Sequence, residues 1–137
     1  MKKTLEERKA EAMELRRRGY NCAQSTIMVF DDVTGLDSDM LARLTSGLGT
    51  GLGCGEVCGV VNAMALAQGA LRSADPSAKA FAGKCSRELT ARFAADNDGR
   101  VRCADLKSQP GVRPCNDLVA QGVEILHDYF SQLPENA

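Results

Sequence analysis

The feature of this sequence that most constrains its fold is an uncharged run of fifteen residues, 57–71. Only Asn62 and Gln68 are polar within it, so a helix formed here would be apolar on every side. Such a helix has to be covered by other helices rather than laid on a surface. We therefore predict a buried central helix over about residues 55–71.

A glycine-rich stretch with two cysteines, Cys54 and Cys58, leads into this run. If the helix begins in the stretch, the two thiols lie four residues apart and project from one face of its N-terminal end. The positive end of the helix dipole and the unpaired backbone N–H groups there favour a thiolate over a thiol. Gly53, Gly55 and Gly59 surround the pair and are candidate positions for binding a cofactor, or for close approach of the backbone to packed helices or to a sulfur site.

The composition excludes several classes of protein. With 137 residues, 44% of them hydrophobic and 26% charged, the chain is long enough for one domain with a substantial core, which we place over 1–137. A net charge of −1 gives no general attraction to nucleic acid or to an anionic membrane. The uncharged run is shorter than a membrane span, and no apolar signal segment follows the N-terminus. We expect a soluble, cytoplasmic protein without nucleic-acid or membrane partners.

Helical periodicity recurs along the rest of the chain, and no stretch of any length alternates as a strand does. The predicted helices cover residues 4–18, 22–34, 38–48, 55–71, 76–96 and from 114 onward. Thr4, Asn21 and Asp75 are their predicted N-caps. Residues 101–112 are predicted to be a loop with a short helical turn at 104–107. The expected fold class is all-α, a single-domain bundle of five or six helices around the central helix.

Six cysteines are many for a chain expected in a reducing compartment, where such a set more often means metal binding or redox chemistry than structural disulfides. Cys22 and Cys115 lie in first turns of predicted helices, as Cys54 and Cys58 do. If these helix ends converge, three or four sulfurs meet at one site. Cys85 would then reach that site from the side.

Three other features have two interpretations each. Cys85 belongs to a row of residues four apart, with Phe81, Leu89 and Phe93, which predicts a buried face and also fits a cysteine that is simply a core residue. His127, the only histidine, fits a catalytic base or ligand, or a surface position on the last helix. Glu56 fits a proton carrier beside the thiols, or a favourable charge in a first turn.

Several segments match a known pattern in the right order. They are GYNCAQS at 19–25, GEVCG at 55–59, CSREL at 85–89, and CNDLV with GVEIL between 115 and 126. Together they resemble the redox-active protein family named for its C_GCAxxG_C_C cysteine pattern. The resemblance covers residues 19 to about 126.

The resemblance implies redox activity and a set of four family cysteines. Carried over position by position, these are Cys22, Cys58, Cys85 and Cys115. The chain departs from the family at Val60 and Ala63, which stand where the family has alanine and a second glycine. Cys54 and Cys103 are additional to the four-cysteine pattern, and the sequence leaves open whether they form a second pair or join the first site.

The cysteines support three hypotheses. In a dithiol and disulfide couple, Cys58 would attack and Cys54 or Cys22 would resolve, with a redox protein or small thiol as partner and no cofactor. In a metal-binding module, an iron–sulfur cluster or zinc would be held by the four family cysteines. In a helical structural or interaction protein, the cysteines would be core residues. The sequence leaves open whether the chain is an oxidoreductase enzyme and allows a homodimer.

Overall fold

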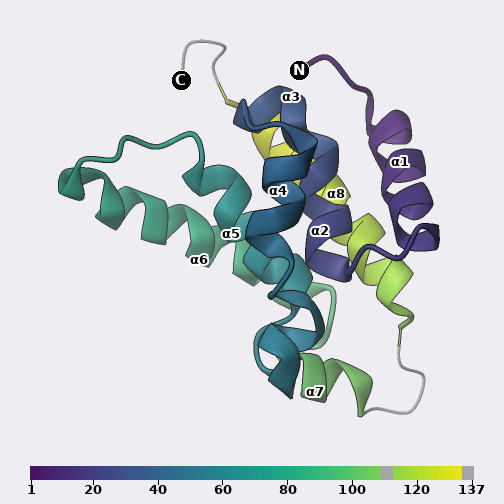
Figure 1. The fold of residues 1–137 in the computed structure, drawn as a ribbon. Helices are drawn as coiled ribbons and strands as arrows, with labels where there is room; N and C mark the ends of the chain where they lie inside the picture. Colours follow the sequence, from purple (N-terminus) through teal and green to yellow (C-terminus); the bar gives the residue numbers. More distant parts are fainter. Residues whose placement is uncertain (109–112, 134–137) are drawn as a thin grey trace.

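The computed structural model describes residues 1–108 and 113–133, which form an all-α bundle (Figure 1). Its helices are α1 (Leu5–Arg17), α2 (Cys22–Ile27), α3 (Asp31–Thr34), α4 (Ser38–Thr45), α5 (Gly59–Gly69), α6 (Lys79–Ala95), α7 (Cys103–Lys107) and α8 (Cys115–Ser131). Five of these have eight residues or more, and the described part of the chain contains no strand. The predicted fold class is confirmed.

Short-range capping sets where the helices begin. The side chains of Thr4, Asn21 and Asp75 accept hydrogen bonds from backbone N–H groups in the first turns that follow, as predicted. The segment predicted as one helix over 22–34 consists of α2, a 3₁₀ turn and α3 in direct succession. Residues 109–112 of the predicted loop lie outside the described residues.

Helix α5 lies at the centre and packs against α2, α6 and α8. Val60, Ala63, Met64 and Ala67 on this helix are completely buried. A glycine on α8 permits the close approach, because a Cβ atom at Gly122 would lie 2.2 Å from a methyl group of Val60. The predicted burial of the central helix is confirmed along this face. Coverage on every side is not, because Leu66 of α5 is 41% exposed. None of the helices in the described residues is both long and apolar enough to cross a membrane.

The central helix begins later than predicted. Residues 50–55 form a tight turn, with left-handed backbone at Thr50 and Leu52 as well as at three glycines. The chain then runs extended and enters α5 only at Gly59. Cys54 and Cys58 therefore do not share a helix face, and that expectation is wrong.

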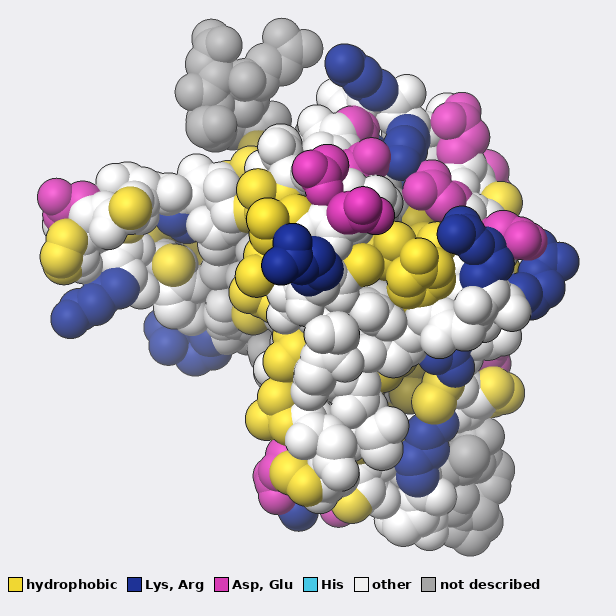
Figure 2. Space-filling model, viewed as in Figure 1, with side chains coloured by type: hydrophobic (Ala, Val, Ile, Leu, Met, Phe, Trp, Pro, Cys, Tyr) yellow, Lys and Arg dark blue, Asp and Glu magenta, His cyan; other side chains and the backbone are white. Residues whose placement is uncertain are grey.

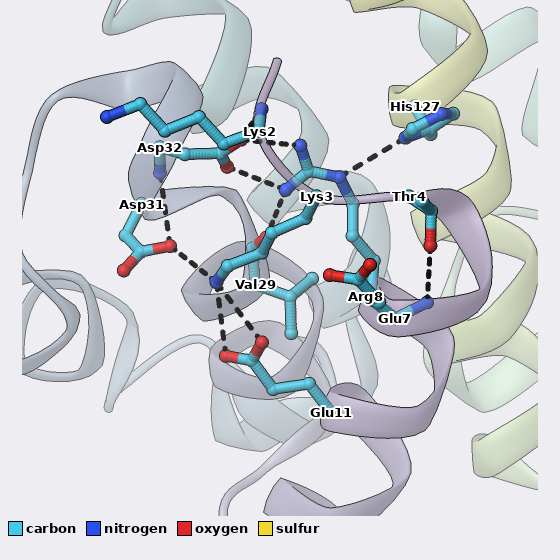
Figure 3. A network of polar contacts seen from close by, with 10 residues as sticks. All are labelled: Lys2, Lys3, Thr4, Glu7, Arg8, Glu11, Val29, Asp31, Asp32 and His127. Carbon is cyan, nitrogen blue, oxygen red and sulfur yellow. Dashed lines mark hydrogen bonds and ion pairs between the residues drawn. The ribbon is translucent and has the colours of Figure 1, made fainter.

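A buried ion pair ties the N-terminal helix to the bundle (Figure 3). The guanidinium group of Arg8 is fully buried and contacts both carboxylate oxygens of Asp32, at 2.7 and 2.8 Å. It also donates to the carbonyl oxygen of Val29 and, through Nε, to Nδ1 of His127 at 3.2 Å. His127 thus has a structural hydrogen bond, about 18 Å along α8 from Cys115 at 1.5 Å per residue.

Two parts of the surface carry exposed apolar side chains. Phe81 was predicted to be buried with Cys85, Leu89 and Phe93, but it is 54% exposed. It lies under the guanidinium group of Arg72, 4.8 Å from its ring centre. A band of hydrophobic side chains runs beside α4 in Figure 2. Met40 and Leu44 are exposed large apolar residues of α4, and Leu36 and Leu66, which are also exposed, line one shallow pocket.

Candidate functional site

Four cysteines line one pocket of about 190 Å³, which we call the cysteine pocket. They are Cys22, Cys58, Cys103 and Cys115. Each stands where a helix begins: three are the first residues of α2, α7 and α8, and Cys58 is the N-cap residue of α5. The helix starts that carry Cys22, Cys58 and Cys115 therefore converge, as the sequence predicted. Cys103 is a fourth thiol in the same pocket.

A short backbone contact brings Cys103 to this pocket. An isolated antiparallel bridge joins Val57 and Arg102, the residues directly before Cys58 and Cys103. The backbone N–H of Cys103 donates to the carbonyl oxygen of Glu56 at 2.7 Å, and that of Cys58 donates across the bridge at the same distance. The side chain of Glu56 pairs with Arg102 at 3.1 Å on the exposed side. The two cysteines thus enter their helices side by side.

A glycine holds α5 against the first turn of α2. A Cβ atom at Gly59 would lie 2.6 Å from Sγ of Cys22 and 2.9 Å from the carbonyl oxygen of Leu48. A Cβ atom at Gly55 would lie 3.3 Å from Cβ of Ala104, whereas a Cβ atom at Gly53 would have open space around it. Gly59 therefore lies directly against the thiol of Cys22. Contact of these glycines with a cofactor stays a prediction.

Burial decides the protonation of the innermost thiol. Cys58 is only 4% exposed, and burial raises its pKa to about 11. The amides of Val60 and Val61 at the start of α5 lower the pKa, while negative charge on Cys22 or Cys103 would raise it. The lowered pKa predicted for this helix end is therefore wrong, because lost hydration outweighs the contribution of the helix amides.

The thiols in the pocket also influence one another. Burial raises the pKa of Cys103, and the neighbouring Cys115 and Cys22 raise it further. Lys107 opposes this rise. Ionising several thiols here is costly, since each thiolate loses water and repels the next. A disulfide carries no charge and so avoids both costs.

Cys85 lies at the opposite end of α5. Its thiol is 3.5 Å from a terminal nitrogen of Arg72, which also contacts the Tyr129 hydroxyl. The eleven residues of α5, about 16 Å at 1.5 Å per residue, separate this thiol from the cysteine pocket. The structure therefore does not bring Cys85 to the shared site. The resemblance to the family had placed Cys85 among the four family cysteines.

Cys54 also lies outside the pocket lining. It is exposed, and its thiol donates to the carbonyl oxygen of Gly51 at 3.6 Å within the tight turn. The sequence left open whether Cys103 joins the first site, and Cys103 was not among the candidate site residues, because a one-residue bridge leaves no periodic pattern. The only signal was the short helical turn predicted at 104–107, directly after this cysteine.

All six cysteines are free thiols. Within the described residues, no group of three or more His, Cys, Asp or Glu side chains is placed to hold a metal ion. The donor chemistry of four thiols suits soft metals. The iron–sulfur or zinc alternative stays a prediction.

The fold and the site define a small helical protein with several thiols gathered where buried helices begin. Residues 20–129 match the family model described as "Putative redox-active protein (C_GCAxxG_C_C)". This region is most of the chain and contains all four pocket cysteines, so the chain belongs to this redox-active family. No curated protein and no solved structure matches the chain.

Proposed function

We propose that this chain is a dithiol–disulfide redox protein whose reacting thiols are those of the cysteine pocket. The observation that carries the proposal is that four cysteines from four separate helix starts line one cavity. Membership of the family supports redox activity in general. The dithiol mechanism and the choice of residues are our own inference.

The reaction exchanges two thiols for one disulfide. A cysteine thiolate attacks a disulfide of the oxidant, forms a mixed disulfide and releases one oxidant thiol. A second pocket thiolate attacks the sulfur of the first cysteine, closes the protein disulfide and releases the other oxidant thiol. The protein loses two electrons and two protons, and the oxidant gains both.

Exposure and charge assign roles to two of the thiols. Cys103 is half-buried and therefore open to an oxidant, and Lys107 partly offsets the rise in its pKa that burial and the neighbouring thiols cause, so we assign it as the attacking thiol. Cys58 is buried and holds its proton up to about pH 11, so we assign it as the resolving thiol. This reverses the role expected for Cys58 from the sequence. Cys22 and Cys115 complete the set as neighbours able to exchange.

Oxidation under controlled potential tests the proposal. Reduced protein is equilibrated without oxygen in dithiothreitol redox buffers, trapped by alkylation and mapped by mass spectrometry. We expect one disulfide between two pocket cysteines. A variant with Cys54→Ala and Cys85→Ala should give the same midpoint potential. A disulfide that involves Cys54 or Cys85, or no disulfide at all, would contradict the proposal.

A second candidate is a metal or iron–sulfur module held by the same four thiols. The gathering of four soft donors favours it, although the side chains as placed form no ligand group. Protein purified without oxygen should then contain zinc or iron in stoichiometric amount, with visible absorption in the case of a cluster. Cys103→Ser would remove that metal, whereas Cys85→Ser would keep it. Metal-free, colourless protein that still forms the pocket disulfide would exclude the metal module, and the dithiol function would be the remaining candidate.

A further inference from the structure

The charges that line the cysteine pocket are all positive. Arg16 and Lys107 lie in its wall, and no described Asp or Glu side chain does. Arg16 is held in position: Nε donates to Oδ1 of Asn116 at 2.9 Å, and one terminal nitrogen donates to the carbonyl oxygen of Tyr20 at 3.2 Å. Its other terminal nitrogen has no partner among the described residues.

Lys107 lines the pocket, and no carboxylate side chain of the described residues lines it. It favours the thiolate of Cys103, so its charge acts within the pocket. It makes no ion pair with any carboxylate in the described part of the chain. Two cations without a counter-charge attract negative ions and raise their local concentration.

The pocket is small and mostly apolar inside. Val60, Leu106 and Leu118 form the apolar part of its wall, and Cys58 is buried beside them. Its volume of about 190 Å³ is below the roughly 300 to 1,000 Å³ of cavities that hold drug-sized ligands. A space of this size favours a small reagent over a disulfide carried by two backbone segments of another protein.

We propose that the oxidant reduced in the cysteine pocket is a small anion with a sulfur–sulfur bond, selected by Arg16 and Lys107. This inference rests on the dithiol function proposed above and names the substrate class for that site. Thiosulfate has the required size, charge and bond, and it is the probe for the test.

The chemistry balances with thiosulfate alone as oxidant. A pocket thiolate attacks the outer sulfur, the sulfur–sulfur bond breaks, and sulfite leaves with the bonding electrons. A cysteine persulfide remains. A second pocket thiolate attacks the cysteine sulfur of that persulfide, releases hydrosulfide and closes the protein disulfide. The two thiol protons end on hydrogensulfite and hydrosulfide, and an added dithiol returns the protein to its reduced form.

Charge selection can be measured apart from this reaction with two alkylating reagents of nearly equal size. Iodoacetate is an anion and iodoacetamide is neutral. The rate ratio of the two reagents is measured at the fastest pocket cysteine and divided by the same ratio for free cysteine. We expect a normalised ratio of roughly threefold to tenfold at low ionic strength, falling as salt screens the cations.

Variants assign this preference to particular side chains. Arg16→Gln and Lys107→Gln should each bring the normalised ratio toward one and slow the release of sulfite from thiosulfate in the presence of dithiothreitol. Lys79→Gln removes the same charge from an exposed position at the start of α6 and should change neither quantity. Because Lys107 is exposed, its variant tests the inference even if Arg16→Gln does not fold.

The outcomes separate this inference from the proposed function. A normalised ratio near one in the unaltered protein, or no change on Lys107→Gln, would overturn anion selection even if the pocket disulfide forms with dithiothreitol. A charge-dependent ratio in a protein that forms no pocket disulfide would contradict the dithiol function, while it would still support anion selection by the pocket. Release of sulfite that depends on both cations would support the two together.

Discussion

The two ends of α5 place cysteine in contrasting surroundings. At the N-terminal end, four thiols share one pocket with apolar walls and two cations. At the C-terminal end, Cys85 is 3% exposed and has Arg72 as its neighbour. Arg72 also donates to Oε1 of Gln68 at 2.9 Å and contacts the Tyr129 hydroxyl, so the polar groups there satisfy one another.

This difference shows what a redox site requires beyond a cation next to a thiol. Cys85 has the cation, but it has no second sulfur that could close a disulfide and no access for an oxidant. The cysteine pocket has neighbouring thiols, a cavity and half-buried sulfurs. Convergence of helix starts, more than the character of one thiol, distinguishes the two ends.

The largest difference that we expect is between two variants that each add a methyl group at one end of α5. In Gly59→Ala the new Cβ atom meets Sγ of Cys22 and the backbone oxygen of Leu48, so α5 has to shift. We expect a loss of about 3 kcal/mol in the free energy of unfolding, measured with urea. Gly69→Ala meets nothing within 4 Å and should be neutral or stabilising by about 0.5–1 kcal/mol. Equal losses in both variants would contradict the packing described at the pocket.

The helical framework was predictable because its signals are local. Thr4, Asn21 and Asp75 cap helices within three residues of themselves, and the uncharged run indicated a buried helix without knowledge of its neighbours. The first turn of α5 was not predictable, since left-handed backbone occurs at Thr50 and Leu52, which give no sign of it.

The composition of the site was predictable only in part. Cysteine at a helix start is visible in the sequence for Cys22 and Cys115. The place of Cys103 depends on a single bridge between residues 45 positions apart, and no periodic pattern encodes such a contact. The raised pKa of Cys58 depends on how completely neighbouring elements exclude water, which sequence position at a helix end does not reveal.

The free energy of unfolding should depend on pH in a way that reports the raised pKa of Cys58. In the unfolded chain Cys58 ionises near its ordinary pKa of 9.0, whereas in the folded protein it holds its proton up to about 11. The folded state is therefore favoured below pH 9 and loses this advantage as the pH rises through 11. We expect a decrease of about 2 kcal/mol in the free energy of unfolding across this range. Cys58→Ala should remove that part of the decrease, and an unchanged profile in this variant would rule out the assigned cause.

Removal of single thiols should affect the rate of disulfide formation differently at the two ends of α5. Cys58→Ala and Cys103→Ala each remove one member of the proposed pair, so each should slow disulfide formation with oxidised dithiothreitol at least about tenfold. Cys85→Ala should leave the rate within about twofold. Free thiols are trapped by alkylation at successive times and quantified by mass spectrometry at fixed pH. A Cys85→Ala rate as slow as that of the pocket variants would show that the two ends are not independent.

The smallest effect concerns the cation beside the lone thiol. Arg72→Gln removes hydrogen bonds to Cys85 and Tyr129 at a half-buried site, and should lower the free energy of unfolding by about 1 kcal/mol. It should leave the rate of pocket disulfide formation unchanged, whereas Lys107→Gln should slow it, because only Lys107 acts on a thiol that has a partner sulfur. Thermal unfolding and the alkylation assay measure the two quantities on the same samples. If Arg72→Gln slowed pocket oxidation as much as Lys107→Gln, the cations would be acting at long range, and the distinction between the two ends of α5 would fail.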